Sequence, residues 1–132
     1  MDRATLARAV FEEGWNRQDY SRVGDALQYV RLHVGEVDRQ LDLDAVRDII
    51  AGWHDAFSDF RFEVHTVVAS GDHAAIRATL HGTNDGPWRG APPTGRTVAV
   101  EHMFFLRFEA DAVVEVWELL DRDAFEVDAS KG

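Results

Sequence analysis

Hydrophobic residues recur every three or four positions over the first 57 residues of the chain, which is the periodicity of amphipathic helices. The pattern divides into three stripes, and Asp42 or Asp44 is placed to cap the third. The stretch 29–40 is ambiguous. We therefore predict three N-terminal helices. Their apolar residues are Ala7, Val10, Phe11 and Gly14, then Tyr20, Val23 and Leu27, and finally Leu43, Val46, Ile50, Trp53 and Phe57.

From Phe60 onward the hydrophobic period changes to two, which is the pattern of half-buried strands. Residues 84–95 hold all three prolines and three of the glycines, so they are expected to form a loop. This order of elements predicts a single α+β domain over residues 1–132, with the helices on one face of an antiparallel sheet. The predicted strands cover residues 60–68, 73–83, 97–108 and 112–120.

Charge and composition exclude several classes of function. The chain has 24 acidic and 14 basic residues, a formal net charge of −10, which disfavours binding to nucleic acid or to anionic membranes. It has no cysteine, so disulfides, thiolate nucleophiles and cysteine-based metal sites are excluded. There is no apolar run of transmembrane length, and acidic residues occupy the place of a signal peptide's apolar segment. We expect a cytoplasmic protein.

The turn of the last predicted hairpin decides which polar side chains meet on one face of the sheet. A two-residue loop at 110–111 would pair Phe104 with Trp117 and set His102 diagonal to Trp117 and Asp121. A three-residue loop would instead make His102 face Glu118. We prefer the two-residue loop because it groups the aromatic rings. The predicted face then carries Val98, Val100, His102, Phe104, Leu106, Glu115, Trp117, Leu119 and Asp121.

Such a face could carry out proton transfer. A carboxyl group walled by rings has its charged form disfavoured, which raises its pKa towards the range of a general acid or base, and an imidazole titrates near neutrality. Residues 109–128 hold eight acidic residues against Arg122 alone, and their repulsion would favour a protonated carboxyl. The alternative interpretation is that Asp121 ends the strand, His102 is an ordinary core residue and Glu115 faces solvent.

Other site types have little support. The six histidines show no spacing that presents two metal ligands on one face, and no nucleotide-binding or serine-nucleophile motif occurs. We therefore predict no metal and no cofactor. The histidines are His33, His54, His65, His73, His81 and His102.

Four segments of the chain resemble the SnoaL-like polyketide cyclases over residues 5–125. The most specific is GTNDGPWRGAPPTGRTVAV with its PPTG loop, followed by VVEVWELLD; FEEGWNRQDY and FSDFRFEVHTVVASGD are similar to earlier parts of the family pattern. The resemblance implies a cone-shaped barrel of the NTF2-like group, in which a curved antiparallel sheet and three N-terminal helices enclose an apolar pocket. It also implies an apolar small-molecule substrate and a homodimer or higher homo-oligomer.

The resemblance further implies ring closure by acid–base catalysis without a cofactor. Asp121 matches the acid/base of the family's W...D motif, and His102 and Glu115 look like the pair used by relatives that open epoxides. In this hypothesis His102 polarises the substrate oxygen and Glu115 orients His102. The residues expected to bind the substrate are Trp117, Phe104, His33 and Trp53.

Two alternative functions stay open at this point. The first is a different enzyme on the same fold: an epoxide hydrolase, for which Arg77 is the arginine to test, or an isomerase or dehydratase. A ketosteroid-type isomerase would need a pocket tyrosine, whereas Tyr20 and Tyr29 both precede the sheet. The second alternative is a non-catalytic protein that binds a small molecule in the same pocket.

Overall fold

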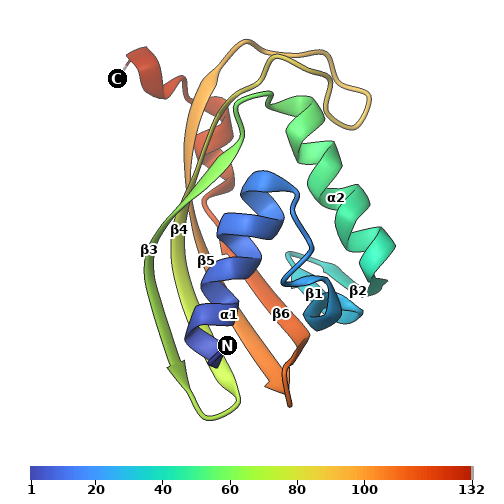
Figure 1. Cartoon of the computed structure of the whole chain (residues 1–132). Helices are drawn as coiled ribbons and strands as arrows, with labels where there is room; N and C mark the ends of the chain where they lie inside the picture. Colours follow the sequence, from blue (N-terminus) through green and yellow to red (C-terminus); the bar gives the residue numbers. More distant parts are fainter. Residues whose placement is uncertain (132) are drawn as a thin grey trace.

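The computed structural model describes residues 1–131. One six-stranded mixed sheet, in the order β2-β1-β6-β5-β4-β3, curves around two helices that lie on the same face (Figure 1). The strands are β1 (Tyr29–Val34), β2 (Val37–Asp42), β3 (Arg61–Ser70), β4 (His73–Thr83), β5 (Thr97–Glu109) and β6 (Ala112–Leu120). The helices are α1 (Arg3–Ala9), which continues as the π-helix η1 (Val10–Trp15), and α2 (Leu43–Ala56). Short 3-10 turns are η2 (Gly24–Leu27), η3 (Arg122–Glu126) and η4 (Ala129–Lys131).

Two of the three predicted helices are confirmed. The helix of residues 3–15 begins at Asp2, whose side chain accepts a hydrogen bond from the Thr5 backbone, and α2 begins at the predicted cap Asp42, which accepts from Ala45. The second predicted helix is only the 3-10 turn η2. Its apolar stripe is short, and the segment contains Gly24, which costs about 1 kcal/mol of helix propensity relative to alanine.

The ambiguous stretch forms the hairpin β1–β2, which turns at Gly35 with a positive φ of 58°. This hairpin joins the sheet because β1 pairs with β6 in parallel, from Arg31 opposite Glu115 to Val34 opposite Glu118. The expectation of a purely antiparallel, barrel-like sheet is therefore wrong. The sheet is curved and stays open, with β2 and β3 as its two edges.

The four strands predicted from Phe60 onward are confirmed, but the register within the last hairpin differs from the prediction. Its loop has two residues as expected, since Glu109 is opposite Ala112. A β-bulge then follows: Phe108 is opposite Val113, whereas Arg107 is opposite Glu115, so one extra residue is inserted in β6. Every later residue of β6 is therefore shifted by one position and turned to the other face.

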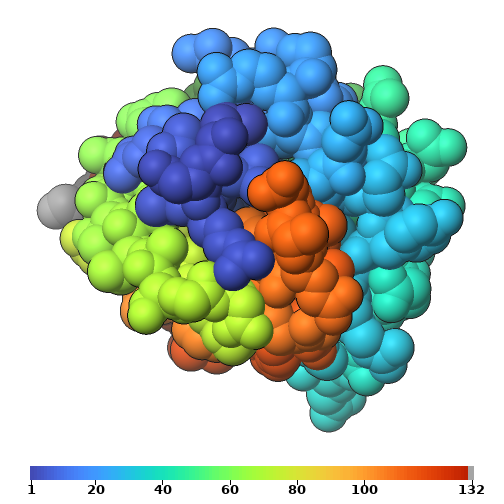
Figure 2. Space-filling model, turned by 60° about the horizontal axis from the view of Figure 1, so that its bottom comes forward, coloured from blue at the N-terminus to red at the C-terminus, as the bar shows by residue number. Residues whose placement is uncertain are grey.

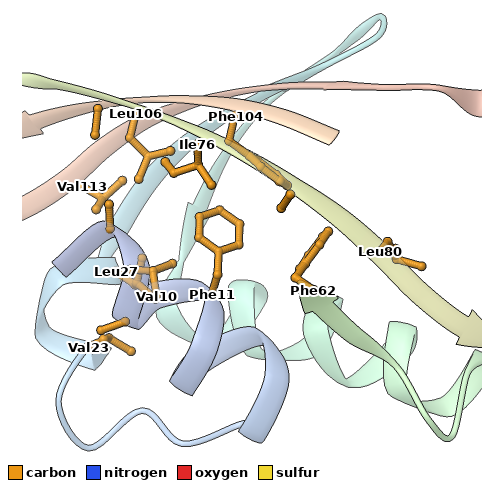
Figure 3. Packing of buried hydrophobic residues seen from close by; sticks show 14 of the residues in the cluster. Val10, Phe11, Val23, Leu27, Phe62, Ile76, Leu80, Phe104, Leu106 and Val113 are labelled. Carbon is orange, nitrogen blue, oxygen red and sulfur yellow. The ribbon is translucent and has the colours of Figure 1, made fainter. Parts of the chain in front are cut away.

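The core lies between the first helix and the concave face of the sheet. Phe11 points from the helix towards Phe62 of β3 and Phe104 of β5, with ring centroids 5.6 and 4.6 Å away (Figure 3). At the bottom of the molecule the N-terminus lies between the tips of two hairpins (Figure 2). There the Arg3 guanidinium donates to the carbonyl oxygens of Gly71 and Ala110, which ties the helix to both turns.

Candidate active site

A cavity of about 1140 Å³ lies on the concave side of the sheet. Its wall is formed by the helices, the inner faces of β1, β2, β5 and β6, and the loop of residues 84–96. Most of the wall is apolar, which is typical of sites for small organic molecules. The aromatic residues of the wall are Phe11, Trp15, Trp53, Phe57, Trp88, Phe104 and Phe125.

The inner face of β6 presents Val116, Glu118 and Leu120 to this cavity. Glu118 is opposite Phe104, and its side chain is only 13% exposed to solvent. The predicted face was wrong because the bulge reverses the alternation of β6. Glu115 and Trp117 consequently lie on the outer, convex face and are not among the residues that line the cavity.

Glu118 is next to the buried His102. The Nε2 atom of His102 lies 3.4 Å from a carboxylate oxygen of Glu118, and the imidazole is 1% exposed. Its Nδ1 is 3.0 Å from the carbonyl oxygen of Val100, which can only accept, so Nδ1 carries a proton. The ring packs parallel to Phe104 and edge-on to Phe62. With Nδ1 directed at Val100, Nε2 is directed at the carboxylate of Glu118, which lines the cavity.

Asp121 lies apart from this pair. Strand β6 ends at Leu120, the Asp121 backbone N–H donates to the carbonyl of Glu101, and the chain turns into η3. The Asp121 side chain is exposed and borders a separate small depression together with Ala99 and Ala124. The expected diagonal contact between His102 and Asp121 is therefore replaced by the contact between His102 and Glu118.

Three predicted site residues meet on the opposite face of the sheet. His33 Nε2 lies 2.6 Å from a Glu115 carboxylate oxygen, and its ring stacks on Trp117 with centroids 5.2 Å apart. The other carboxylate oxygen of Glu115 accepts from Arg107 at 3.1 Å. The hydrogen bond with His33, helped by Arg107 and opposed by partial burial, lowers the pKa of Glu115. The raised pKa expected for a carboxyl walled by rings is wrong for this residue.

Two predicted binding residues, Phe104 and Trp53, do line the cavity. Trp53 of α2 packs against Trp88 of the 84–96 loop, with centroids 4.3 Å apart. Buried Asn84 holds this loop: its amide nitrogen donates to the carbonyls of Ala56 and Gly86, and its oxygen accepts from Thr94. The loop with the PPTG sequence thus forms part of the cavity wall beside the C-terminal end of α2 (Figure 1).

The residues expected for other enzymes of this fold lie elsewhere. Arg77 is exposed on β4, Tyr29 is 70% exposed, and neither these two nor Tyr20 lines the cavity. Within residues 1–131, no three His, Asp or Glu side chains are grouped so that they could hold a metal ion. No helix in the same range is both long and apolar enough to span a membrane.

Comparison with protein families gives one match, to the model of the SnoaL-like polyketide cyclases, over residues 5–127. The chain belongs to the SnoaL-like polyketide cyclase family. A search of curated protein sequences gave no match.

Several solved structures share the fold over nearly the whole chain. TsrD from Streptomyces laurentii is 25% identical, with a TM-score of 0.78. The match covers 97% of this chain and 96% of TsrD. AclR from Streptomyces galilaeus, provisionally assigned as a hydroxylase, is 26% identical, with a TM-score of 0.73. The match covers 97% of this chain and 80% of AclR. A SnoaL-like polyketide cyclase from Agrobacterium tumefaciens is 24% identical, with a TM-score of 0.77. The match covers 96% of this chain and 97% of that protein.

Glu118 is the site residue that the sequence interpretation of this SnoaL-like chain missed. The signal for it was the adjacent pair Val113 and Val114, which interrupts the alternation of β6 and is where the extra residue is accommodated. The rejected three-residue loop also brought His102 to Glu118. That alternative paired the two residues by lengthening the loop by one residue, whereas in the structure the extra residue is the bulge in β6.

Proposed function

We propose that this SnoaL-like protein is a cofactor-independent cyclase that closes a ring in an apolar small molecule, with Glu118 as its general acid and base. The observation that carries the proposal is the position of the Glu118 carboxylate, which lines an apolar cavity and touches a buried imidazole. A carboxyl group that lines a substrate-sized apolar cavity is placed to move protons on a bound molecule. A cytoplasmic location is part of the same proposal.

In an aldol closure, the Glu118 carboxylate removes a proton from the carbon beside a substrate carbonyl. The resulting enolate carbon attacks a second carbonyl of the same molecule, and a carbon–carbon bond forms. The new alkoxide then takes the proton back from Glu118. In a substrate with an epoxide, protonated Glu118 would give its proton to the epoxide oxygen while a hydroxyl group of the substrate attacks the carbon, so that a new carbon–oxygen bond forms as the epoxide bond breaks. The proton of that hydroxyl group would then return to the Glu118 carboxylate. Both reactions regenerate Glu118 and need no other reactant.

His102 is a positioning residue in this proposal. Its Nδ1 is held by the Val100 carbonyl, so its Nε2 faces Glu118 and stabilises the carboxylate when the imidazole is protonated. Phe104 and Trp53 offer flat apolar walls for a folded substrate. Holding the chain in one folded pose contributes strongly to the rate, since ring closure is limited by orientation.

A matched pair of amide variants tests the assignment. Ring closure would be followed by mass spectrometry and chiral chromatography on a panel of linear and partly cyclised polyketide carboxylic acids and their esters. Glu118→Gln is expected to lower kcat by about 100-fold or more while substrate binding persists. Asp121→Asn, the residue favoured by the family motif, is expected to stay within about twofold of the wild type.

The opposite pattern, with activity lost in Asp121→Asn and kept in Glu118→Gln, would show that the acid/base is Asp121. Binding of panel compounds without any turnover would instead favour the alternative of a small-molecule-binding protein. Incorporation of solvent oxygen into the product would favour a hydrolase.

We also propose that the protein acts as a homodimer joined by the outer face of its sheet. Four large apolar side chains are exposed there on neighbouring strands: Phe105 is opposite Trp117, and Met103 is opposite Leu119. Contiguous apolar patches of this kind mark association surfaces. The patch has charges of both signs beside it, on Arg107 and Glu115, which suits pairing of the same surface about a twofold axis.

A further inference from the structure

The wall and rim of the cavity are rich in arginine, although the chain as a whole has a net charge of −10. Four arginines line it, and they differ in their surroundings. Arg96 contacts Glu126 at 3.2 Å, and the guanidinium of Arg89 lies 5.0 Å from the Trp88 ring centroid. Arg39 and Arg122 have no carboxylate partner among residues 1–131. These two cations are therefore available to a ligand.

Arg39 interrupts an apolar face. It lies on the edge strand β2 opposite Leu32, and its neighbours on the cavity side of that strand are Val37 and Leu41. Alternation along β2 turns all three side chains towards the cavity. Arg39 is exposed to solvent at the rim, so its guanidinium is hydrated in the free protein and can meet an anion that enters the cavity.

Arg122 reaches the same hairpin from the other side. It follows the end of β6, and its guanidinium lies against Gly35 in the β1–β2 turn. A Cβ atom at position 35 would come within 2.7 Å of the Arg122 Nη2 atom. The glycine thus leaves room for the guanidinium as well as allowing the positive φ of the turn. Arg39 and Arg122 both border the cavity at this hairpin, and Val34 of the hairpin is directly opposite Glu118.

We propose that Arg39 and Arg122 bind a carboxylate group of the ligand, so the cavity takes apolar carboxylic acids. This inference deepens the proposed function, since it assumes that the same cavity holds the substrate. Two arginines can hold a carboxylate through charge-assisted hydrogen bonds. The lining also includes four acidic residues, which balance its four arginines, so a lining without net charge suits a singly charged carboxylate better than a phosphate dianion. These acids are Glu36, Asp48, Glu118 and Glu126.

The anchor would also orient the substrate. A carboxylate held at the β1–β2 hairpin would place the adjoining carbon skeleton along the apolar wall, next to the carboxyl group of Glu118. Binding energy from a group remote from the reacting atoms can fix the pose that ring closure needs.

Two fluorescent probes of the same shape test the proposal without any turnover: anthracene-2-carboxylic acid and its carboxamide. Binding would be followed at pH 7 and low salt through energy transfer from the cavity tryptophans. The wild type is expected to bind the acid about tenfold more tightly than the carboxamide. Arg39→Gln and Arg122→Gln should each reduce that preference, and the double variant should abolish it. Exposed Arg61 lies outside the cavity lining, so Arg61→Gln should retain it.

Unchanged binding of the carboxamide shows that each variant is folded with an intact cavity. Equal affinity of the wild type for both probes would overturn the proposal, and so would a preference for the acid that survives in the double variant. Failure of the acid to saturate the protein would also overturn it, since a cavity of about 1140 Å³ has room for a three-ring molecule. Glu118→Gln should still bind the acid more tightly than the carboxamide. The binding test therefore stands even if Glu118 proves not to be the catalytic acid and base.

Discussion

Glu118 lies 3.4 Å from the Nε2 atom of His102, and this contact depends on a single extra residue at the start of β6. Without the bulge at residues 113–114, regular alternation would turn Glu115 towards the concave face and Glu118 away from it. The bulge thus selects which carboxyl group meets the buried imidazole. β-Bulges that re-aim a side chain are frequent next to active sites.

The pairing of His102 with Glu118 predicts a change in the pH dependence of catalysis. His102→Gln is expected to lower kcat by about tenfold or more with little effect on KM, because Glu118 loses the imidazole that lies against its carboxylate. The pH profile of kcat should also shift, which loss of packing alone would not cause. His81→Gln, on the outer surface beside Glu63, is the matched control and should leave both rate and profile unchanged. An unaltered profile in His102→Gln would contradict the positioning role.

The outer cluster around Glu115 predicts a pH-dependent contribution to stability. Glu115 has a pKa below its ordinary value of 4.5, because it accepts hydrogen bonds from His33 and Arg107. It therefore contributes stability above that value, and the contribution is lost as the pH falls through the lower folded-state pKa. Urea unfolding should show Glu115→Gln less stable than the wild type at pH 7, with the two converging in acid.

Glu109 provides the control for that experiment, since it also contacts Arg107 but has a side chain that is 69% exposed. Glu109→Gln should change the urea midpoint little at either pH, as is usual for exposed ion pairs. A difference between Glu115→Gln and the wild type that stays constant from pH 7 down to strong acid would rule out the linkage.

The contact between the 84–96 loop and α2 predicts a strong effect of one methyl group. A Cβ atom on Gly86 would lie 1.9 Å from the backbone oxygen of Asp55, and the Gly86 N–H donates to the Ala56 carbonyl. Gly86→Ala is expected to lower the free energy of unfolding by about 2–3 kcal/mol. Gly90→Ala in the same loop meets no atom within 4 Å and has only the strain of its φ of +81°, about 1 kcal/mol. Equal losses in the two variants would contradict the close approach.

The exposed outer face predicts self-association. Leu119 is 73% exposed within the proposed contact, so Leu119→Asp should give a monomer at concentrations where the wild type is a dimer, as measured by sedimentation velocity. Val127 is 58% exposed but lies outside the sheet, and Val127→Asp should leave the dimer intact. A wild-type chain that is monomeric throughout would refute the proposal.

Local patterns were sufficient to predict much of the fold. The 3.6-residue stripe ending at Phe57, with Asp42 as its cap, gave α2, and the change of period at Phe60 gave the four later strands. The 29–42 hairpin was not predicted because its pairing with β6 joins distant parts of the chain, which no local pattern reports. Its polar residues Arg31 and Asp38 obscured the alternation further.

The site was harder to predict because β6 is amphipathic in two equivalent ways. Glu115, Trp117 and Leu119 form one possible inner set, and Val116, Glu118 and Leu120 form the other. Each contains one acid and two large apolar residues, so burial alone could not choose between them. One inserted residue decided the face, whereas His102 and Phe104 on the regular strand β5 were placed correctly on the inner face.

The position of β6 in the sheet, between β5 and β1, also has a consequence for the order of folding. The β1–β2 hairpin emerges early from the ribosome, but within residues 1–131 its only ladder to the rest of the sheet is with the strand made last. Pairing between segments so distant in the chain is slow because loop closure precedes the gain in contacts. Pulsed hydrogen exchange should therefore find β3, β4 and β5 protected first, with the hairpin and the cavity completed together in the final step.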